Sequence, residues 1–388
     1  MDISVFFTPS SVTIEEATAG RNRLQHKIVR FEADQFPDVS EGNLVIFGVE
    51  EERKSVFEAG CAQAPDAVRR QLYELYDFDD AVSIVDLGNI RAGEGYADTL
   101  FAVEQTVEHL IKKGAIPILI GGTQDLTVAC YRGYGHLEQT VNLVTVDSLL
   151  DFGEPGEELS DRNYLNHIVL HNPNYLFNYS NIGQQRYLVD PELMRLMEKM
   201  YFDTVRLGVA NENLWETEPV LRQADLVSVD LSCVRWSDLS ATTHGGPNGL
   251  YAEQICQMAR YAGLNDKLTS IGFYNYNPLL DKDGKGAELV AQVIWCFIDG
   301  YKDRKGDQPL GNREDFVKYT VHSEAHGHQL VFFKSEKSDR WWMDVPYPAG
   351  KKNKYERHHL VPCTYGDYQC ATNDDIPDRW WKTYQKLT

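Results

Sequence analysis

The sequence is short of basic residues. Its 388 residues include 38 lysines and arginines but 58 aspartates and glutamates, which gives a formal net charge of −20. A field of this sign repels the phosphate backbone of nucleic acids. We therefore expect no nucleic-acid partner. The hydrophobic share of 43% and the charged share of 25% are ordinary for a globular protein with a sizeable core.

Long apolar runs and paired cysteines are also missing. No run approaches the roughly 20 apolar residues that a membrane-spanning helix needs, and the segment Met1 to Ser10 does not resemble a secretory leader. The seven cysteines are scattered, odd in number and without a Cys-x-x-Cys pair, which indicates reduced thiols. These absences predict a cytoplasmic protein that does not act at a membrane.

Short runs of apolar and β-branched residues alternate with helix-length amphipathic segments. The clearest amphipathic segment is Asp98 to Lys113, with apolar residues at three- and four-residue spacing. This alternation predicts a three-layer α/β/α fold, with a mostly parallel sheet covered on both faces. The predicted strands are 44–49, 82–87, 116–120, 141–146, 205–209, 226–229 and 268–273, and the other predicted helices are 190–200, 251–262 and 286–301.

The character of the chain changes near Gln308, beyond which Trp, Tyr and His are frequent. We expect an N-terminal extension at 1–43, the α/β domain at 44–307, and an aromatic C-terminal extension at 308–388. Trp341-Trp342 and Trp380-Trp381 favour packing of this extension on the main domain, because large aromatic side chains dominate burial. The alternative is that the extension forms a surface for a protein partner.

Carboxylates follow two of the predicted strands. Asp147 and Asp151 come after the run 141–146, and Asp230 comes after the run 226–229. Ligands bind beyond the carboxyl ends of the strands in open parallel sheets, so we expect these three side chains around one pocket. Oxygen-only clusters suit hard ions such as Mg²⁺ and Mn²⁺. The alternative is that each aspartate caps the helix after its strand.

The order of these segments resembles the ureohydrolase superfamily of arginases, agmatinases and formimidoylglutamases. In that family a Gly-Gly-Asp-His, an Asp-Ala-His-x-Asp and a Ser-Phe-Asp-x-Asp segment supply six ligands to two manganese ions. This chain keeps the frames Gly121-Gly122, Val146-Asp147 and Ser228-Val229-Asp230, together with Asn277-Pro278. The segment 177–186 is similar to the formimidoylglutamase branch. The resemblance implies an arginase-type fold over about 44–301 and a homo-oligomer.

Four positions depart from the family pattern. Gln124 stands where the family has its first ligand histidine, and Leu149 stands where it has the histidine of the second segment. Ser232 replaces the second aspartate of the third segment. Asn275 replaces the glutamate that contacts the amidine or guanidine group of the substrate.

The surviving ligand positions are unevenly distributed between the two implied ions. A carboxamide oxygen can coordinate a hard ion, so Gln124, Asp147, Asp151 and Asp230 could hold one ion. The second ion would need Leu149, which offers no lone pair. The resemblance therefore implies at most one Mn²⁺ or Mg²⁺, with no metal at all as the other outcome.

Loss of the second ion bears on function, because the nucleophile of ureohydrolysis is a hydroxide bridging two metals. We predict a formimidoylglutamase-like protein that has lost this activity and acts as a binding or scaffold pseudoenzyme, with a small amidine or glutamate-like ligand. The alternative is an active hydrolase of a linear amidine or guanidine C–N bond, such as that of formimidoylglutamate, with one metal or a rebuilt site. His244 and His171 are its candidate catalytic residues, although a structural loop histidine is the simpler interpretation of either.

Overall fold

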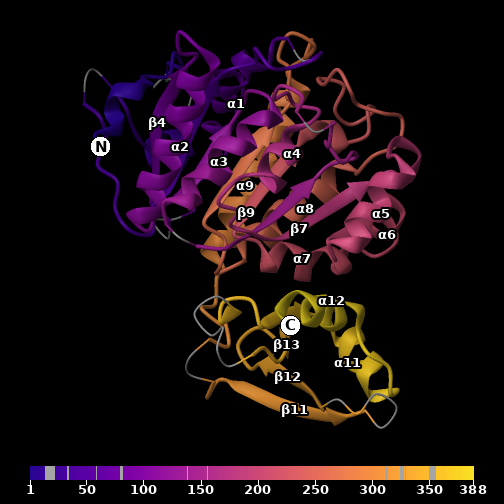
Figure 1. The fold of residues 1–388 in the computed structure, drawn as a ribbon. Coiled ribbons are helices and arrows are strands. Elements are labelled where there is room, and N and C mark those ends of the chain that lie inside the picture. Colours follow the sequence, from indigo (N-terminus) through magenta and orange to yellow (C-terminus); the bar gives the residue numbers. More distant parts are fainter. Residues whose placement is uncertain are drawn as a thin grey trace.

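The computed structural model describes residues 1–13, 22–32, 35–57, 59–78, 82–137, 139–154, 156–310, 313–323, 327, 329–348 and 355–388. Within them, one large sheet has the strand order β1-β4-β3-β5-β10-β9-β6-β7-β8, and β2 also pairs with β4 (Figure 1). Every pair is parallel except β1 with β4. The strands are β1 (Phe7–Thr8), β2 (Val29–Arg30), β3 (Leu44–Glu50), β4 (Ile84–Arg91), β5 (Ile116–Ile120), β6 (Val141–Val146), β7 (Leu176–Gln184), β8 (Asp203–Arg206), β9 (Leu226–Asp230) and β10 (Ser270–Tyr274).

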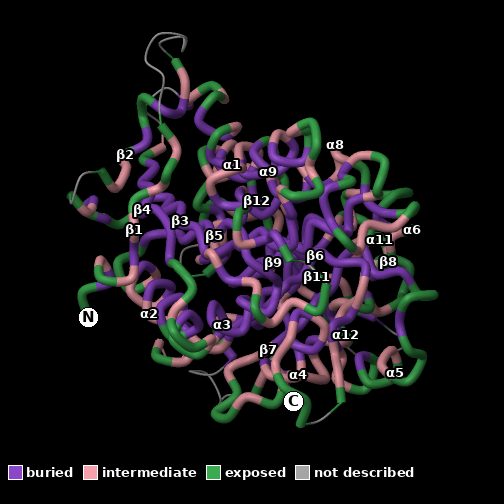
Figure 2. The backbone as a smooth tube through the Cα atoms, turned by 90° about the horizontal axis from the view of Figure 1, so that it is seen from above, coloured by how far each residue is buried: buried purple, intermediate pink, exposed green. Residues whose placement is uncertain are grey.

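Helices cover both faces of this sheet. One face carries α1 (Ala64–Leu72), α7 (Glu218–Gln223), α8 (Ala252–Gly263) and α9 (Lys285–Lys302), and the other carries α2 (Tyr96–Lys112), α3 (Thr127–Gly135), α4 (Tyr164–Val169) and α5 (Pro191–Lys199). A short helix, α6 (Leu207–Glu212), follows β8. Two apolar clusters fill the spaces between these layers, and the strands at the centre are buried (Figure 2). The predicted three-layer fold is confirmed.

The predicted segments agree with the structure to different degrees. The strands predicted at 116–120 and 141–146 coincide with β5 and β6. The strand predicted at 205–209 is wrong at its end, because β8 stops at Arg206 and α6 begins at the next residue. No strand was predicted at β7, which lies between β6 and β8. Among the described residues, no helix has the length and apolar character needed to cross a membrane.

The C-terminal part forms a second unit below the main sheet in Figure 1. It has an antiparallel sheet of β11 (Phe316–His322), β12 (Gln329–Ser335), β13 (Trp341–Asp344) and β14 (Leu360–Cys363), with α11 (Tyr365–Thr372), α12 (Asp378–Leu387) and its own apolar core. The unit contacts residues at the amino ends of β6 to β9. His358 hydrogen bonds Thr140 at 2.7 Å, and Arg357 pairs with Asp225 at 2.9 Å.

Candidate functional site

The chain turns sharply where it leaves β5. Gly121 and Gly122 both have positive φ angles, 88° and 67°. A Cβ added at Gly122 would lie 2.7 Å from the backbone oxygen of Glu51, so a side chain does not fit there. This turn sets Gln124 against the ends of the neighbouring strands. The Gly121-Gly122 frame thus has a steric cause in the backbone.

Three buried carboxylates gather at the carboxyl ends of β6 and β9. These strands are parallel neighbours, with Val146 paired to Val229, so Asp147 and Asp230 leave the sheet side by side. Burial, and then the charges of Asp151 and Asp230, raise the pKa of Asp147 well above its usual range. Burial likewise raises the pKa of Asp151 to about 7. Hydrogen bonding links Asp147 to Asp151, so a shared proton reduces the charge of the cluster.

A guanidinium faces this cluster. The Nη1 atom of Arg162, in the loop before α4, lies 3.6 Å from Asp151 Oδ1. Burial alone would lower the pKa of Arg162, but the carboxylates of Asp151, Asp230 and Asp147 raise it above its usual value. The Arg162 side chain is one quarter exposed (25%), whereas that of Asp151 is 3% exposed. The protein therefore supplies a positive charge of its own to these carboxylates.

Gln124 and Asn275 connect the turn after β5 with Asp230. The backbone N–H of Gln124 donates to Asn275 Oδ1 at 3.2 Å, and Gln124 Nε2 donates to Ser228 Oγ at 3.2 Å. Burial raises the pKa of Asp230, against the opposing effects of hydrogen bonds from Ser232 and Asn275. Asn275 has a φ of 65°, a left-handed conformation that asparagine tolerates better than most residues. Asn275 thus belongs to the hydrogen-bonded wall of the cluster.

Several polar atoms around the cluster are buried without a hydrogen-bond partner among the described residues. They are Asp151 Oδ2, Gln124 Oε1, Ser232 Oγ and His244 Nε2. The His244 ring lies edge-on to Phe57, with 5.1 Å between the ring centroids. Burial and the charge of Arg162 lower the pKa of His244 to about 4, so His244 is neutral at pH 7. His244 therefore lies within the electrostatic reach of Arg162, which faces the cluster.

His171 lies elsewhere. It precedes β7, and its ring packs edge-on against Tyr131 of α3 at 5.8 Å while Nδ1 contacts the Pro173 oxygen at 3.0 Å. The amino end of β7 pairs with the start of β6, whereas Asp147 follows the end of β6. The structure therefore does not bring His171 to the carboxylates.

Two residues of the site were not predicted from the sequence. Arg162 follows Asp151 by eleven positions in a loop without a recognisable motif. Tyr164, the first residue of α4, is fully buried, and its hydroxyl has no partner among the described residues. Burial raises the pKa of Tyr164 well above its usual value, and the nearby carboxylates add to this effect. No spacing rule connects these side chains to Asp147, because the fold alone brings them there.

The chemistry of the cluster is limited by the side chains that form it. Within the described ranges, no three His, Cys, Asp or Glu side chains are grouped so that they could hold a metal ion. The arrangement instead provides carboxyls that hold protons, an arginine that offsets their charge, and a neutral histidine.

Comparison with known proteins identifies the family to which this fold belongs. The sequence model of the arginase family matches residues 42–299. The chain belongs to the arginase family. Formimidoylglutamase of Photorhabdus laumondii is 25% identical over 252 residues, which covers 61% of this chain and 78% of that protein. Formimidoylglutamase of Staphylococcus epidermidis is 21% identical over 257 residues, covering 62% and 79%.

Solved structures of the family share the fold. Formimidoylglutamase from Bacillus subtilis superposes with a TM-score of 0.66 at 16% identity, covering 78% of this chain and 98% of that one. Formiminoglutamase from Trypanosoma cruzi, solved with Mn²⁺, gives 0.64 at 18% identity, covering 73% and 99%. The resemblance to ureohydrolases near formimidoylglutamase is thus confirmed, and the fold is of the arginase type.

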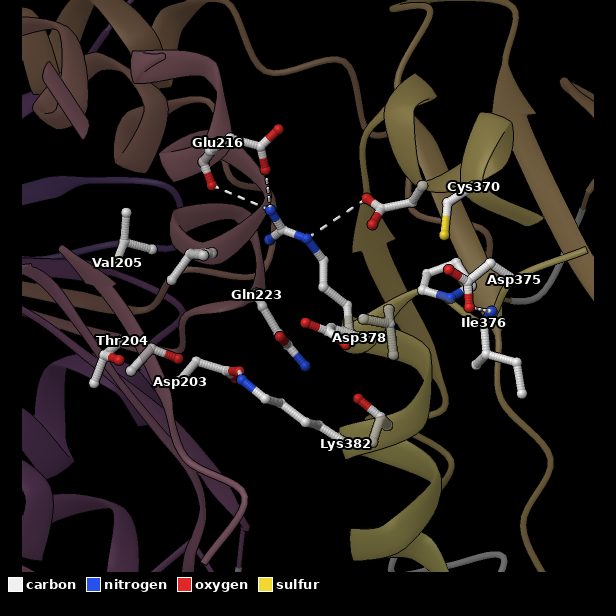
Figure 3. A pocket seen from close by; sticks show the side chains of 17 residues that line it. Asp203, Thr204, Val205, Glu216, Gln223, Cys370, Asp375, Ile376, Asp378 and Lys382 are labelled. Atoms are coloured by element: carbon white, nitrogen blue, oxygen red, sulfur yellow. Dashed lines mark hydrogen bonds and ion pairs between the residues drawn. The ribbon is translucent and has the colours of Figure 1, made fainter. Parts of the chain in front are cut away.

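A cavity of about 510 Å³ lies between the two units (Figure 3), and none of the three aspartates of the carboxylate cluster lines it. Asp203 and Val205 of β8 line one side, and Asp378 and Lys382 of α12 line the other. Lys382 donates to Asp203 at 3.0 Å across the cavity. Asp203 is the first residue of β8, so this cavity adjoins the amino ends of the strands. Asp147 and Asp230 lie at the opposite, carboxyl ends.

Proposed function

We propose that this arginase-family protein is formimidoylglutamase-like, has lost two-manganese amidine hydrolysis, and acts as a binding or scaffold protein. The observation that carries this proposal is the guanidinium of Arg162, 3.6 Å from Asp151 in the carboxylate cluster. A fixed positive charge there weakens the attraction of the cluster for a divalent ion and for a cationic amidine. The resident arginine then does the electrostatic work that a metal would do.

The residues present do not fit a pair of ions. The resemblance assigns Leu149 and Ser232 to ligand positions of the second ion, and leucine has no donor atom while serine offers a neutral hydroxyl. A single ion would need the oxygens of Asp147, Asp151 and Asp230, which in the described structure are not grouped so as to hold a metal, and it would compete with Arg162 for Asp151. We therefore propose one Mn²⁺ or Mg²⁺ per chain, or none.

The substrate-contacting position also supports a silent site. Asn275 is neutral, so it cannot form an ion pair with an amidinium group. Its carboxamide is engaged by the Gln124 N–H and by Asp230. Because its pKa is lowered to about 4, His244 is neutral at pH 7 and is therefore a weak general acid for a leaving amine.

The C-terminal unit is the proposed scaffold element. Arg222 of α7 lies 4.4 Å from the ring centroid of the buried Trp342, in agreement with packing against the main domain, whereas Trp341 and Trp380 are buried in the core of the C-terminal unit itself. Trp381 remains 43% exposed. We propose that the outer face of α12 contacts a protein partner, and the homo-oligomer implied by the resemblance stays a prediction.

Metal content and turnover, measured together, test the proposal. Protein dialysed against excess Mn²⁺ and then desalted should retain one ion per chain or fewer by elemental analysis. Hydrolysis of formimidoylglutamate, agmatine and arginine should stay at the rate of the buffer control, because the bridging hydroxide needs two ions. Two bound ions together with turnover at ordinary enzymatic rates would show that the site is active.

A further inference from the structure

Helices α8 and α9 pack side by side on one face of the large sheet (Figure 2). They come closest where Gly263 of α8 meets Gly300 of α9. A Cβ added at Gly263 would lie 2.8 Å from the Tyr301 nitrogen and closer still to the Phe297 oxygen. Because no side chain fits between the two backbones here, the helix axes lie closer than the usual distance of about 8–10 Å.

Each of these helices carries a cysteine next to the close contact. Cys256 lies one turn before Arg260 on α8, and Cys296 lies one turn before Asp299 on α9. Arg260 Nε donates to Asp299 Oδ2 at 2.8 Å, which fixes the register of the two helices. Residues three and four positions apart share one face of a helix, so the two cysteines face each other one turn before this ion pair.

The two thiols interact directly. The Cys256 thiol donates a hydrogen bond to the Cys296 sulfur. This bond lowers the pKa of Cys296 against the opposing effect of burial, and the charge of Arg260 adds to the lowering. The same bond, followed by burial, raises the pKa of Cys256. Cys296 is therefore the better nucleophile of the two, because the thiolate is the reactive form of cysteine.

Access to solvent separates this pair from most of the other cysteines. Cys256 and Cys296 are partly exposed, as is Cys370 of α11. Burial and the charges of nearby aspartates raise the pKa of Cys370, so its thiol is the less reactive. The remaining cysteines are buried: Cys61, Cys130, Cys233 and Cys363. The pair thus combines access, a lowered pKa and a second sulfur beside the first.

We propose that Cys256 and Cys296 form a reversible redox site, which hydrogen peroxide oxidises to a disulfide between α8 and α9. In the structure both are free thiols. A disulfide requires Cα atoms about 4.4–6.8 Å apart, and the close approach of the helices at Gly263 and Gly300 favours such a separation. These residues lie outside the carboxylate cluster, and the proposal holds whether or not that cluster is silent.

The oxidation proceeds in two steps. The Cys296 thiolate attacks one oxygen of the peroxide, so an S–O bond forms, the O–O bond breaks, and the hydroxide that leaves is protonated to water. The Cys256 sulfur then attacks the sulfenic sulfur, so the S–S bond forms, the S–O bond breaks, and a second water leaves with the Cys256 proton. The two thiols lose two electrons and two protons, and the peroxide is reduced to two waters.

Thiol counting and peptide mapping of the wild-type protein test the site. After treatment with hydrogen peroxide, alkylation of the unfolded chain should modify two fewer cysteines than the seven of the untreated protein, and dithiothreitol should restore all seven. Mass spectrometry of the non-reduced digest should show the Cys256 peptide joined to the Cys296 peptide, with the loss of two hydrogens. Seven alkylated cysteines after peroxide, or a cross-link between other cysteines, would overturn the proposal.

Serine variants assign the two roles. In Cys256→Ser the sulfenic acid has no thiol with which to condense, so peroxide together with dimedone, a reagent for sulfenic acids, should label Cys296. In Cys296→Ser the attacking sulfur is absent, so Cys256 should gain no label. Cys370→Ser is the matched control and should form the disulfide as the wild type does. A label on Cys256 in Cys296→Ser, or no disulfide in Cys370→Ser, would overturn the assignment.

Discussion

Replacing Arg162 with alanine removes the guanidinium that faces the carboxylate cluster. Truncating one partner of a fully buried ion pair costs about 3–5 kcal/mol. Arg162 is one quarter exposed, and its Nη1 atom lies 3.6 Å from Asp151 Oδ1, so solvent screens part of the interaction. We therefore expect Arg162→Ala to lower the free energy of unfolding by about 1–3 kcal/mol at pH 8.

The size of this loss depends on pH. The folded protein raises the pKa of Asp147, and raises that of Asp151 to about 7, whereas both lie near 3.9 in the unfolded chain. The folded state therefore binds more protons between these values. The resulting stabilisation is complete below the unfolded pKa and is lost as the pH rises through the folded pKa. Without Arg162 the ionised carboxylates repel more strongly, so the variant should differ little from wild type at pH 5 and most at pH 8.

Thermal unfolding at pH 5 and pH 8, without divalent ions, measures both effects. At pH 8 the melting temperature of Arg162→Ala should fall by roughly 2–6 °C. Arg195→Ala on α5 is the matched control and should melt like wild type. Added Mn²⁺ should raise the melting temperature of Arg162→Ala more than that of wild type, because the competing cation is gone. An Arg162→Ala protein as stable as wild type at pH 8 would refute the reasoning.

Two further predictions concern the contact between the two units. Burial, with Lys267 and other nearby cations, lowers the pKa of His358 well below its usual 6.5, so its stabilising contribution is present above pH 6.5 and is lost as the pH falls. Denaturant unfolding between pH 8 and pH 5 should therefore depend less on pH in His358→Gln than in wild type or in the control His171→Gln. Asp225 is fully buried between Lys267 and Arg357, so Asp225→Asn should lower the free energy of unfolding by about 3–5 kcal/mol in the same assay. The control Asp378→Asn, at an exposed position, should lower it little. A loss below about 1 kcal/mol in Asp225→Asn would contradict this prediction.

The sequence predicted the central strands of the sheet well, but it predicted β7 and β8, at one edge of the sheet, poorly. β5 and β6 are continuous apolar runs that are buried along their whole length, which is the pattern a sequence shows most clearly. β7 was not predicted as a strand because many of its buried residues are polar. Asn181 of this strand donates to Thr145 Oγ1 and to the Leu149 oxygen, so its polar groups are satisfied only after the sheet has assembled. β8 is an edge strand of intermediate burial, and its apolar residues continue directly into α6.

The candidate site divides in the same way. Asp147, Asp151 and Asp230 could be placed together from the sequence, because they follow strands whose carboxyl ends meet at one edge. The residue that offsets their charge could not be placed. Arg162 reaches Asp151 from a loop whose path depends on the packing of α4, and nothing in its local sequence separates it from a solvated surface arginine.

The aspartates of the cluster also have a local role that needs no metal. Asp230 caps a short 3-10 helix, because its Oδ1 accepts the Ser232 N–H at 2.7 Å. Asp147 Oδ1 accepts the Leu149 N–H at 2.8 Å and closes a similar turn. Each of these bonds occupies one carboxylate oxygen and fixes the path of the chain as it leaves a strand. Leu149 and Ser232 contribute only their backbone N–H groups to these turns, so other side chains at these two positions would leave the turns intact. The two aspartates accept these bonds, so the fold still needs them even without a metal.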